Sequence, residues 1–211
     1  MSDEIIIRNT TKNDASSIVK LQNETFFDLP EHARWKKEHI FAHVDKFPQG
    51  QFCAISNNEI VGSCSSFLTL RSIILKPHTW IEACGDFYFK NHIVSGDILY
   101  DADISVHPDF QRMGIANSMN DARKMLVSKL SIRSFFSGSR LSNYGKYSDQ
   151  FTPDEYAQKV IDNSISDRVL SFHLSCDFKF VKLLPNYLDD LNSKNNGVLV
   201  EWINPNYKNN P

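Results

Sequence analysis

The feature that most constrains the fold is a strand-to-helix corner near the middle of the chain, with the sequence HPDFQRMGIA over residues 107–116. Residues 98–106 before it alternate in polarity as a strand does, and Pro108 stops that strand. From Gly114 to Leu130 apolar residues recur at helical spacing, which predicts a packed amphipathic helix. The corner therefore predicts a sheet with a helix packed against it.

The rest of the chain supplies further strands and helices. We expect strands at 4–8, 52–56, 60–70, 132–136, 178–184 and 198–203, and helices at 11–26, 31–46, from 152, and at 167–175. Asn57-Asn58-Glu59 is typical of a hairpin turn between two of these strands. Residues 71–96 are irregular, and we expect a loop with short strands there. This order predicts one α+β domain over residues 1–211, with a mixed sheet and helices on its faces.

Charge and cysteine spacing exclude several classes of protein. The net charge of −2 gives no positive field for nucleic acid or an anionic membrane, and no apolar run approaches the roughly 18 residues of a membrane span. The four cysteines form no CxxC, which favours reduced thiols over a disulfide or zinc framework. The start MSDEIIIRN lacks the features of a signal peptide. We therefore expect a cytoplasmic protein without nucleic-acid or membrane partners.

The start of the helix at Gly114 is suited to an anion. Helix N-termini carry unpaired backbone N–H groups and a partial positive charge. Gly114 lets a ligand approach the backbone, Ala116 keeps the first turn free of bulk, and Arg112 adds a positive charge at the rim. The amides of residues 112–116 are thus placed to bind a pyrophosphate. The alternative is a simple turn with solvated Gln111 and Arg112 side chains.

The same segment resembles the acetyl-CoA-binding motif of the GNAT superfamily of N-acetyltransferases. That motif runs Val-x-Pro and then Gln/Arg-x-x-Gly-x-Gly/Ala, and here it reads Val106-His107-Pro108 and Gln111-Arg112-Met113-Gly114-Ile115-Ala116. The flanking elements fit the same fold over nearly the whole chain. The resemblance implies a mixed, mostly antiparallel twisted sheet with helices on both faces.

The resemblance also implies acetyl-CoA as co-substrate and assigns its binding residues. Strand residues would pair with the pantetheine arm, and loop amides would bind the pyrophosphate. These residues are Ile104, Ser105, Val106, Gln111, Arg112, Met113, Gly114, Ile115 and Ala116. A sheet that splays after Val106 would leave backbone groups for the pantetheine amides to pair with. CoA should then lie between this strand and the strand near residues 132–136.

A narrower resemblance concerns the C-terminal part. The stretches Tyr144-Gly145-Lys146-Tyr147, Thr152-Pro153-Asp154-Glu155-Tyr156, Leu184-Pro185-Asn186-Tyr187-Leu188 and Glu201-Trp202-Ile203-Asn204-Pro205 are similar to GNAT domains that lie N-terminal to carbon-nitrogen hydrolase domains. This similarity names no substrate.

Candidate catalytic residues are Tyr100, Asp101, Asp103 and His173. A protonated amine needs a base, and Tyr100 stands where some GNAT enzymes carry a glutamate, which leaves Asp101 and Asp103 as candidates. Either carboxylate is alternatively a structural hydrogen-bond acceptor, and a raised pKa would distinguish the base. His173 stands where many GNAT enzymes carry the general-acid tyrosine, and it is alternatively structural.

Further candidates complete the sequence-based hypothesis. Tyr144, Tyr147 or Tyr156 are alternatives to His173 as the acid. His39 and His43 share a helix face, but without further ligands we expect a solvated face and no metal. The prediction is transfer of an acetyl group to the amine of a small molecule or peptide by direct attack in a ternary complex. A homodimer is the oligomer that the prediction allows. The alternatives are an inactive acyl-CoA-binding or regulatory module and an interaction domain.

Overall fold

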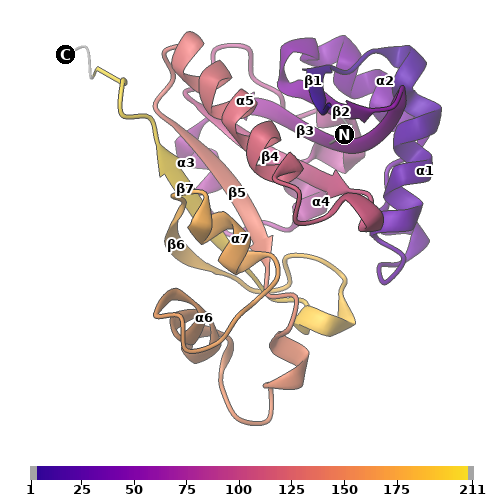
Figure 1. Cartoon of the computed structure of the whole chain (residues 1–211). Helices are drawn as coiled ribbons and strands as arrows, with labels where there is room; N and C mark the ends of the chain where they lie inside the picture. Colours follow the sequence, from indigo (N-terminus) through magenta and orange to yellow (C-terminus); the bar gives the residue numbers. More distant parts are fainter. Residues whose placement is uncertain (1–3, 209–211) are drawn as a thin grey trace.

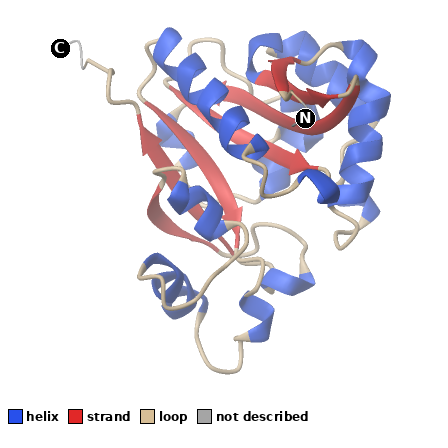
Figure 2. Ribbon diagram, in the orientation of Figure 1, coloured by secondary structure: helices blue, strands red, loops and turns tan. Residues whose placement is uncertain are grey.

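The computed structural model describes residues 4–208, and its centre is a seven-stranded sheet (Figures 1 and 2). The strands lie in the order β1-β2-β3-β4-β5-β7-β6. All neighbours are antiparallel except β4 and β5, which are parallel. The strands are β1 Ile6–Asn9, β2 Gln51–Ser56, β3 Glu59–Thr69, β4 Ile98–Val106, β5 Ser134–Arg140, β6 Lys179–Leu184 and β7 Gly197–Ile203. This confirms the predicted fold class.

Helices cover both faces of the sheet. They are α1 Ala15–Thr25, α2 Lys37–Lys46, α3 Arg71–Ile74, α4 Trp80–Ala83, α5 Ile115–Lys129, α6 Pro153–Ile161 and α7 Leu170–Ser175. Residues of α1 to α4 share one core cluster with Phe67 and Tyr100, whereas α5, α6 and α7 share another with Leu99 and Phe135. In Figure 1, α5 crosses the front of the sheet. No helix within residues 4–208 is long and apolar enough to cross a bilayer.

Local sequence signals account for most element boundaries. Asn57 and Asn58 both have positive φ, as the two central residues of a tight hairpin turn between β2 and β3 must. Thr152 caps α6 by accepting a hydrogen bond from the Glu155 amide, and Pro153 occupies the first helical position. β4 has the predicted bounds. The β5 strand begins two residues later than expected and continues to Arg140.

The segment 71–96 differs from the prediction. It holds α3, α4 and the helical turn Gly85–Phe89 instead of short strands. Thr79 caps α4 with a reciprocal bond to Glu82, so the local sequence supports a helix start there. Phe89 then packs in the core against Phe67, with ring centroids 4.9 Å apart. Tertiary packing of the aromatic residues thus compensates for a segment too short and irregular to show helical periodicity.

The prediction that His39 and His43 lie on a solvated face of α2 is also wrong. His39 and His43 are 6% and 1% exposed because the turn Gly85–Phe89 lies over them. The His43 ring stacks on Phe89, and its Nε2 is 2.7 Å from the Phe87 carbonyl oxygen. Burial lowers the pKa of His43 to about 3, against the opposing effect of that hydrogen bond. The two histidines therefore belong to the core.

The parallel pair β4 and β5 separates along its length (Figure 1). Pairing runs from Ile98 with Ser134 to Asp101 with Ser137 and then stops. The prediction placed this divergence after Val106, five residues too late. A β-bulge at Ala102 bends β4 and turns it away from β5 at this point. Residues 102–106 consequently have no strand partner on the β5 side.

Candidate active site

A cavity of about 400 Å³ lies where β4 and β5 separate. Its walls are α1, the second half of β4, the loop 110–112, the first turn of α5, the end of β5, α7 and residues 187–188. The opening between the C-terminal ends of parallel strands is where α/β sheets commonly bind ligands. The cavity therefore joins the predicted phosphate corner to the predicted catalytic residues.

The corner at the start of α5 has free backbone donors. Within residues 4–208, the amides of residues 112–116 have no hydrogen-bond partner on the protein. Gly114 has φ +80°, and a Cβ there would meet no atom within 4 Å. Arg112 also has a positive φ, of 64°, which is uncommon for a residue with a side chain. The loop therefore combines unpaired backbone donors with open space at Gly114, as an anion site requires.

Seven of the nine predicted cofactor-binding residues line the cavity. They are Ile104, Val106, Gln111, Arg112, Gly114, Ile115 and Ala116. Ser105 does not line it, because its hydroxyl lies 3.0 Å from the Ser63 hydroxyl within the sheet. Met113 is 55% exposed and does not line the cavity. Ser105 and Met113 were predicted from their place in the motif alone. They differ from the other seven residues because they do not line the cavity.

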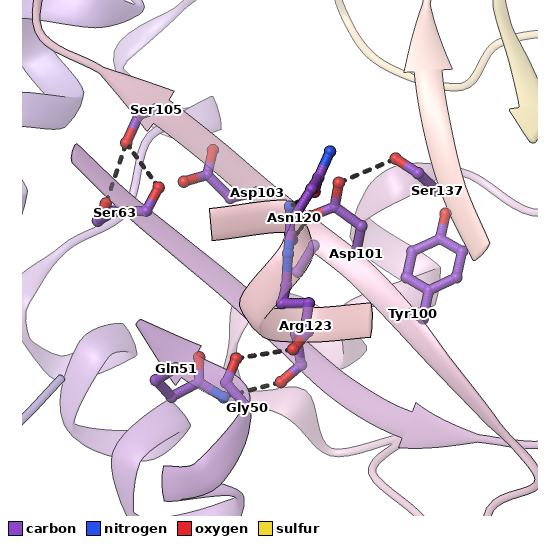
Figure 3. A network of polar contacts seen from close by, with 12 residues as sticks. Gly50, Gln51, Ser63, Tyr100, Asp101, Asp103, Ser105, Asn120, Arg123 and Ser137 are labelled. Carbon is purple, nitrogen blue, oxygen red and sulfur yellow. Dashed lines mark hydrogen bonds and ion pairs between the residues drawn. The ribbon is translucent and has the colours of Figure 1, made fainter. Parts of the chain in front are cut away.

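A bulge at Ala102 places the two aspartates on opposite faces of the sheet. Figure 3 shows Asp101 beside Ser137, with Asp103 further along β4 toward Ser105. Ser65 pairs with Asp103 and Ser66 with Asp101, so Ala102 has no partner on β3. Its carbonyl oxygen instead accepts a hydrogen bond of 2.8 Å from the Trp80 indole. Without the bulge, Asp101 and Asp103 would share one face.

Asp101 is the centre of a buried charge network on the α5 side. The Arg123 guanidinium donates to one carboxylate oxygen, and the Ser137 hydroxyl donates to the other over 3.0 Å. Burial would raise the pKa of Asp101, but Arg123 and His173 stabilise the carboxylate and hold the pKa below its usual range. Asp101 is therefore ionised and paired at neutral pH.

Asp103 behaves in the opposite way. It lies on the α1 side, lines the cavity, and accepts a 2.7 Å hydrogen bond from the Gln22 amide. Burial, together with the nearby negative charge of Asp101, raises its pKa to about 7. A carboxyl with this pKa exchanges protons near neutral pH. Of the two aspartates, Asp103 is the one whose electrostatics suit a base.

His173 lies in the cavity wall on α7 and is only 2% exposed. Its Nε2 is 3.0 Å from the Ser137 hydroxyl and 3.7 Å from Asp101. Its Nδ1 is 3.1 Å from both the Ser139 hydroxyl and the Val169 carbonyl oxygen. The imidazole is therefore fixed by hydrogen bonds while still facing the cavity.

Tyr100 does not line the cavity. It is a fully buried residue of β4, and its hydroxyl oxygen lies 3.1 Å from that of Tyr187 and 3.2 Å from His78 Nε2. Tyr187 does line the cavity. The alternatives Tyr144, Tyr147 and Tyr156 lie in the core cluster of α6, away from the cavity.

Sequence reasoning missed Tyr187 as a site residue. Two strand glycines make its place, because a Cβ at Gly138 would lie 1.9 Å from the Tyr187 hydroxyl oxygen and one at Gly197 2.8 Å from its ring. A glycine inside a strand often marks a close approach of another group. Gly138 and Gly197 were therefore the available signal, although neither indicates which residue approaches.

Two arginines of the cavity wall add positive charge near its mouth. Arg112 and Arg168 are exposed, line the cavity, and are not paired with any carboxylate in the described part of the chain. Arg140, by contrast, is buried and lies 3.2 Å from Asp28 and 3.3 Å from Asp190. Arg168 was not predicted, because it precedes α7 and is distant in sequence from the loop 111–116. In residues 4–208, no cluster of His, Cys, Asp and Glu is arranged to hold a metal ion.

Comparison with known proteins gives two close relatives in Bacillus subtilis (strain 168). The probable hydrolase YhcX is 39% identical over 205 residues, which are 97% of this chain but 39% of that protein. The uncharacterized N-acetyltransferase YkwB is 34% identical over 208 residues, covering 98% of this chain and 92% of YkwB. No family model matches the chain.

Two solved structures share the fold. The loading GNATL domain of CurA from Lyngbya majuscula superposes with a TM-score of 0.83 at 22% identity, over 95% of this chain and 98% of that one. The GphF GNAT-like decarboxylase in complex with isobutyryl-CoA has a TM-score of 0.78 at 18% identity, over 94% and 98%.

Proposed function

This chain belongs to the GNAT family of N-acetyltransferases, as the motif around Gly114 predicted, and from this we propose that it transfers an acetyl group from acetyl-CoA to an amine. The acceptor is the amine of a small molecule or a peptide. The match to 39% of a probable hydrolase is consistent with the narrower resemblance to GNAT domains joined to hydrolases. The observation that carries the proposal is the cavity itself, because it joins free helix-terminal amides to a carboxyl with a pKa near 7.

The corner of α5 fits the diphosphate of CoA. The amides of residues 112–116 have no hydrogen-bond partner among residues 4–208 and the space at Gly114 is open, and Arg112 and Arg168 supply positive charge in the wall of the same cavity. The edge of β4 beyond Asp101 lacks a strand partner, so its backbone groups are available to the amides of the pantetheine arm. In this arrangement the thioester reaches the level of Asp101 and Ser137, where the strands separate.

The acceptor amine then approaches from the α1 side, where Asp103 lines the cavity. Asp103 removes a proton as the nitrogen attacks the thioester carbon. His173 lines the cavity beside Ser137. It supplies a proton to the departing thiolate. Direct attack needs no covalent enzyme intermediate, because the cavity holds both reactants next to each other.

The experiment that tests this function measures CoA thiol release from acetyl-CoA over a panel of amines, with CoA binding measured in parallel by calorimetry. Turnover with at least one amine supports the proposal. Tight CoA binding without thiol release for any amine would instead support an inactive acyl-CoA-binding module. The absence of CoA binding would contradict both and leave an interaction domain.

A second candidate reaction uses the same cavity. GphF is named a GNAT-like decarboxylase, and this chain shares its fold. The specific observation in favour is the buried His173 imidazole with the hydroxyls of Ser137 and Ser139 beside it. Loss of CO2 from a carboxylate β to a thioester leaves an enolate, and an imidazolium is able to protonate its carbon. Release of CO2 from malonyl-CoA without an amine would identify this reaction.

A further inference from the structure

We infer that Tyr187, Tyr100 and His78 form a proton-exit path from the acceptor cavity through the buried side of the sheet. The inference rests on the proposed acetyl transfer and adds a route for the proton that an ammonium acceptor must lose. None of these three residues belongs to the loop that binds the CoA diphosphate. The three side chains come from segments distant in sequence, and only the fold brings them together.

The path is continuous in hydrogen bonds. Tyr187 lines the cavity, with its hydroxyl lying over Gly138 of β5. The Tyr187 and Tyr100 hydroxyl oxygens are 3.1 Å apart, and the Tyr100 hydroxyl oxygen is 3.2 Å from His78 Nε2. Tyr100 is fully buried, whereas His78 is only partly buried, in the loop before α4. The chain of donors and acceptors therefore begins at the ligand and ends near solvent.

The hydrogen bonds have one direction. His78 Nδ1 lies 2.8 Å from the Lys76 carbonyl oxygen, which accepts only, so Nδ1 carries the hydrogen. In the neutral imidazole Nε2 is then an acceptor, and it takes the Tyr100 hydroxyl hydrogen. The Tyr100 oxygen is left to accept from Tyr187. Tyr187 consequently presents an oxygen lone pair to the cavity, and each transfer along the path moves a proton outward.

The surrounding charges keep each group in the form that the path needs. Burial lowers the pKa of His78, and Lys182 of β6 lowers it further, while the Lys76 hydrogen bond and Glu82 of α4 act in the opposite direction. The imidazole is therefore neutral at pH 7 and able to accept a proton. Burial raises the pKa of both tyrosines, and the neighbouring Cys84 and Asp101 contribute in the same sense. The hydroxyls thus pass protons without remaining ionised.

The reaction balance requires such an exit. An ammonium and acetyl-CoA yield an amide, CoA thiol and one free proton. The N–C bond forms as the C–S bond breaks, and one nitrogen proton reaches the thiolate sulfur by way of the cavity acid and base. A second nitrogen proton must reach solvent before the attack. It passes to Tyr187, while the Tyr187 proton moves to Tyr100 and the Tyr100 proton moves to His78 Nε2. The His78 imidazolium then releases its Nδ1 proton to solvent, and the neutral ring returns to the Nδ1–H tautomer before the next turnover.

The test compares Tyr100→Phe with wild type on two acceptors of similar size. Phenethylamine is protonated at neutral pH, whereas phenylhydrazine is neutral there. Tyr100→Phe interrupts the path without changing any cavity-lining residue, so CoA affinity should be unchanged. We expect kcat with phenethylamine at pH 7 to fall by about 10- to 100-fold, whereas kcat with phenylhydrazine should stay within about twofold. Tyr88→Phe, at a partly exposed tyrosine outside the cavity, is the control variant.

The outcomes separate the path from the proposed function. Equal losses with both acceptors, or no loss with either, would overturn the path while leaving acetyl transfer intact. No thiol release by wild type with any amine would count against acetyl transfer itself. The path then has its own readout, because nitrogen NMR of labelled histidine should show His78 as the Nδ1–H tautomer, with its Nε2 resonance moved by Tyr100→Phe. An Nε2–H tautomer would overturn the direction of the path.

Discussion

At the scale of single residues, two aspartates two positions apart have opposite chemistry. Asp101 meets Arg123 and Ser137, and its pKa falls below the usual range. Asp103 accepts a hydrogen bond from the neutral amide of Gln22, and burial together with the Asp101 charge raises its pKa to about 7. The sequence left both as candidate bases and named a raised pKa as the distinguishing property. The electrostatics favour Asp103.

Asp103→Asn should change both activity and stability with pH. If Asp103 is the base, wild-type kcat/KM rises as pH passes through about 7, and the variant loses this limb and about 100-fold in rate above it. A pH–rate profile on one responsive amine checks this. A variant that retained the wild-type limb would show that another group titrates.

Asp103→Asn should lower the activity but raise the free energy of unfolding at high pH. The unfolded carboxyl ionises near pH 3.9, whereas the folded one keeps its proton to about pH 7, so wild-type stability declines over this interval as pH rises. Asparagine removes that cost. We expect Asp103→Asn to be more stable than wild type by about 2 kcal/mol at pH 8, after allowance for partial exposure, and the gain to vanish near pH 4. Urea unfolding at both pH values measures it.

At the scale of elements, β4 and α5 form a single functional unit. The bulge at Ala102 turns the second half of β4 away from β5, and α5 starts at the corner that follows. Arg123 of α5 reaches back to Asp101 of β4, so one buried ion pair joins the helix to the strand next to the cavity. The phosphate corner and the catalytic level of the cavity are thereby held at a fixed separation.

Arg123→Met should show how strongly this pair is needed. Arg123 is fully buried, and its loss leaves the Asp101 carboxylate buried without its positive partner. Removing one member of such a pair costs about 3–5 kcal/mol of unfolding free energy. The double variant Asp101→Leu/Arg123→Met should recover most of the loss. Urea unfolding of the four proteins at pH 7 provides the comparison, and a single-variant cost below about 1 kcal/mol would contradict the assigned role.

Gly114→Trp tests the corner of α5. The indole would fill the space in front of the free amides, so CoA binding should be lost. Since a Cβ there meets no atom within 4 Å, the main cost to stability comes from φ +80°, about 1–2 kcal/mol. Met113→Trp is the matched control, because Met113 lies in the same loop but outside the cavity. CoA affinity that survived in folded Gly114→Trp would disprove the diphosphate placement.

At the scale of the whole molecule, one sheet with helices on both faces surrounds a site built from all parts of the chain. α1 and α7 flank the cavity, although α1 ends at Thr25 and α7 begins only at Leu170. The C-terminal strands β6 and β7 contribute through Tyr187, which lies between them. A ligand in this cavity should therefore stabilise the fold as a whole.

Ligand binding should be visible as a rise in melting temperature. At a CoA concentration of 100 Kd the free energy of unfolding increases by about 2.7 kcal/mol. For a chain of this length that corresponds to roughly 5–10 °C. Pantetheine at the same concentration lacks the diphosphate and should give a much smaller shift. Equal shifts from the two compounds would place the binding energy outside the corner of α5.

Much of the fold follows from local patterns that the sequence displays directly. The polarity alternation of β4, the helical spacing of α5, the hairpin at Asn57-Asn58 and the cap of α6 at Thr152 are each determined within a few residues. The loop 111–116 was identified in the same way. Segment 71–96 was not, because its short helices depend on packing between distant aromatic side chains.

The sequence by itself determined the order of the strands and of the longer helices, the family, and the corner proposed to bind an anion. Only the tertiary structure decided which side chains meet. A bulge of one residue at Ala102 sets Asp101 and Asp103 on opposite faces, and glycines in two strands admit Tyr187 beside the cavity. The physical reason is that periodicity depends on neighbours in the chain, whereas pKa values and hydrogen-bonded paths depend on neighbours in space.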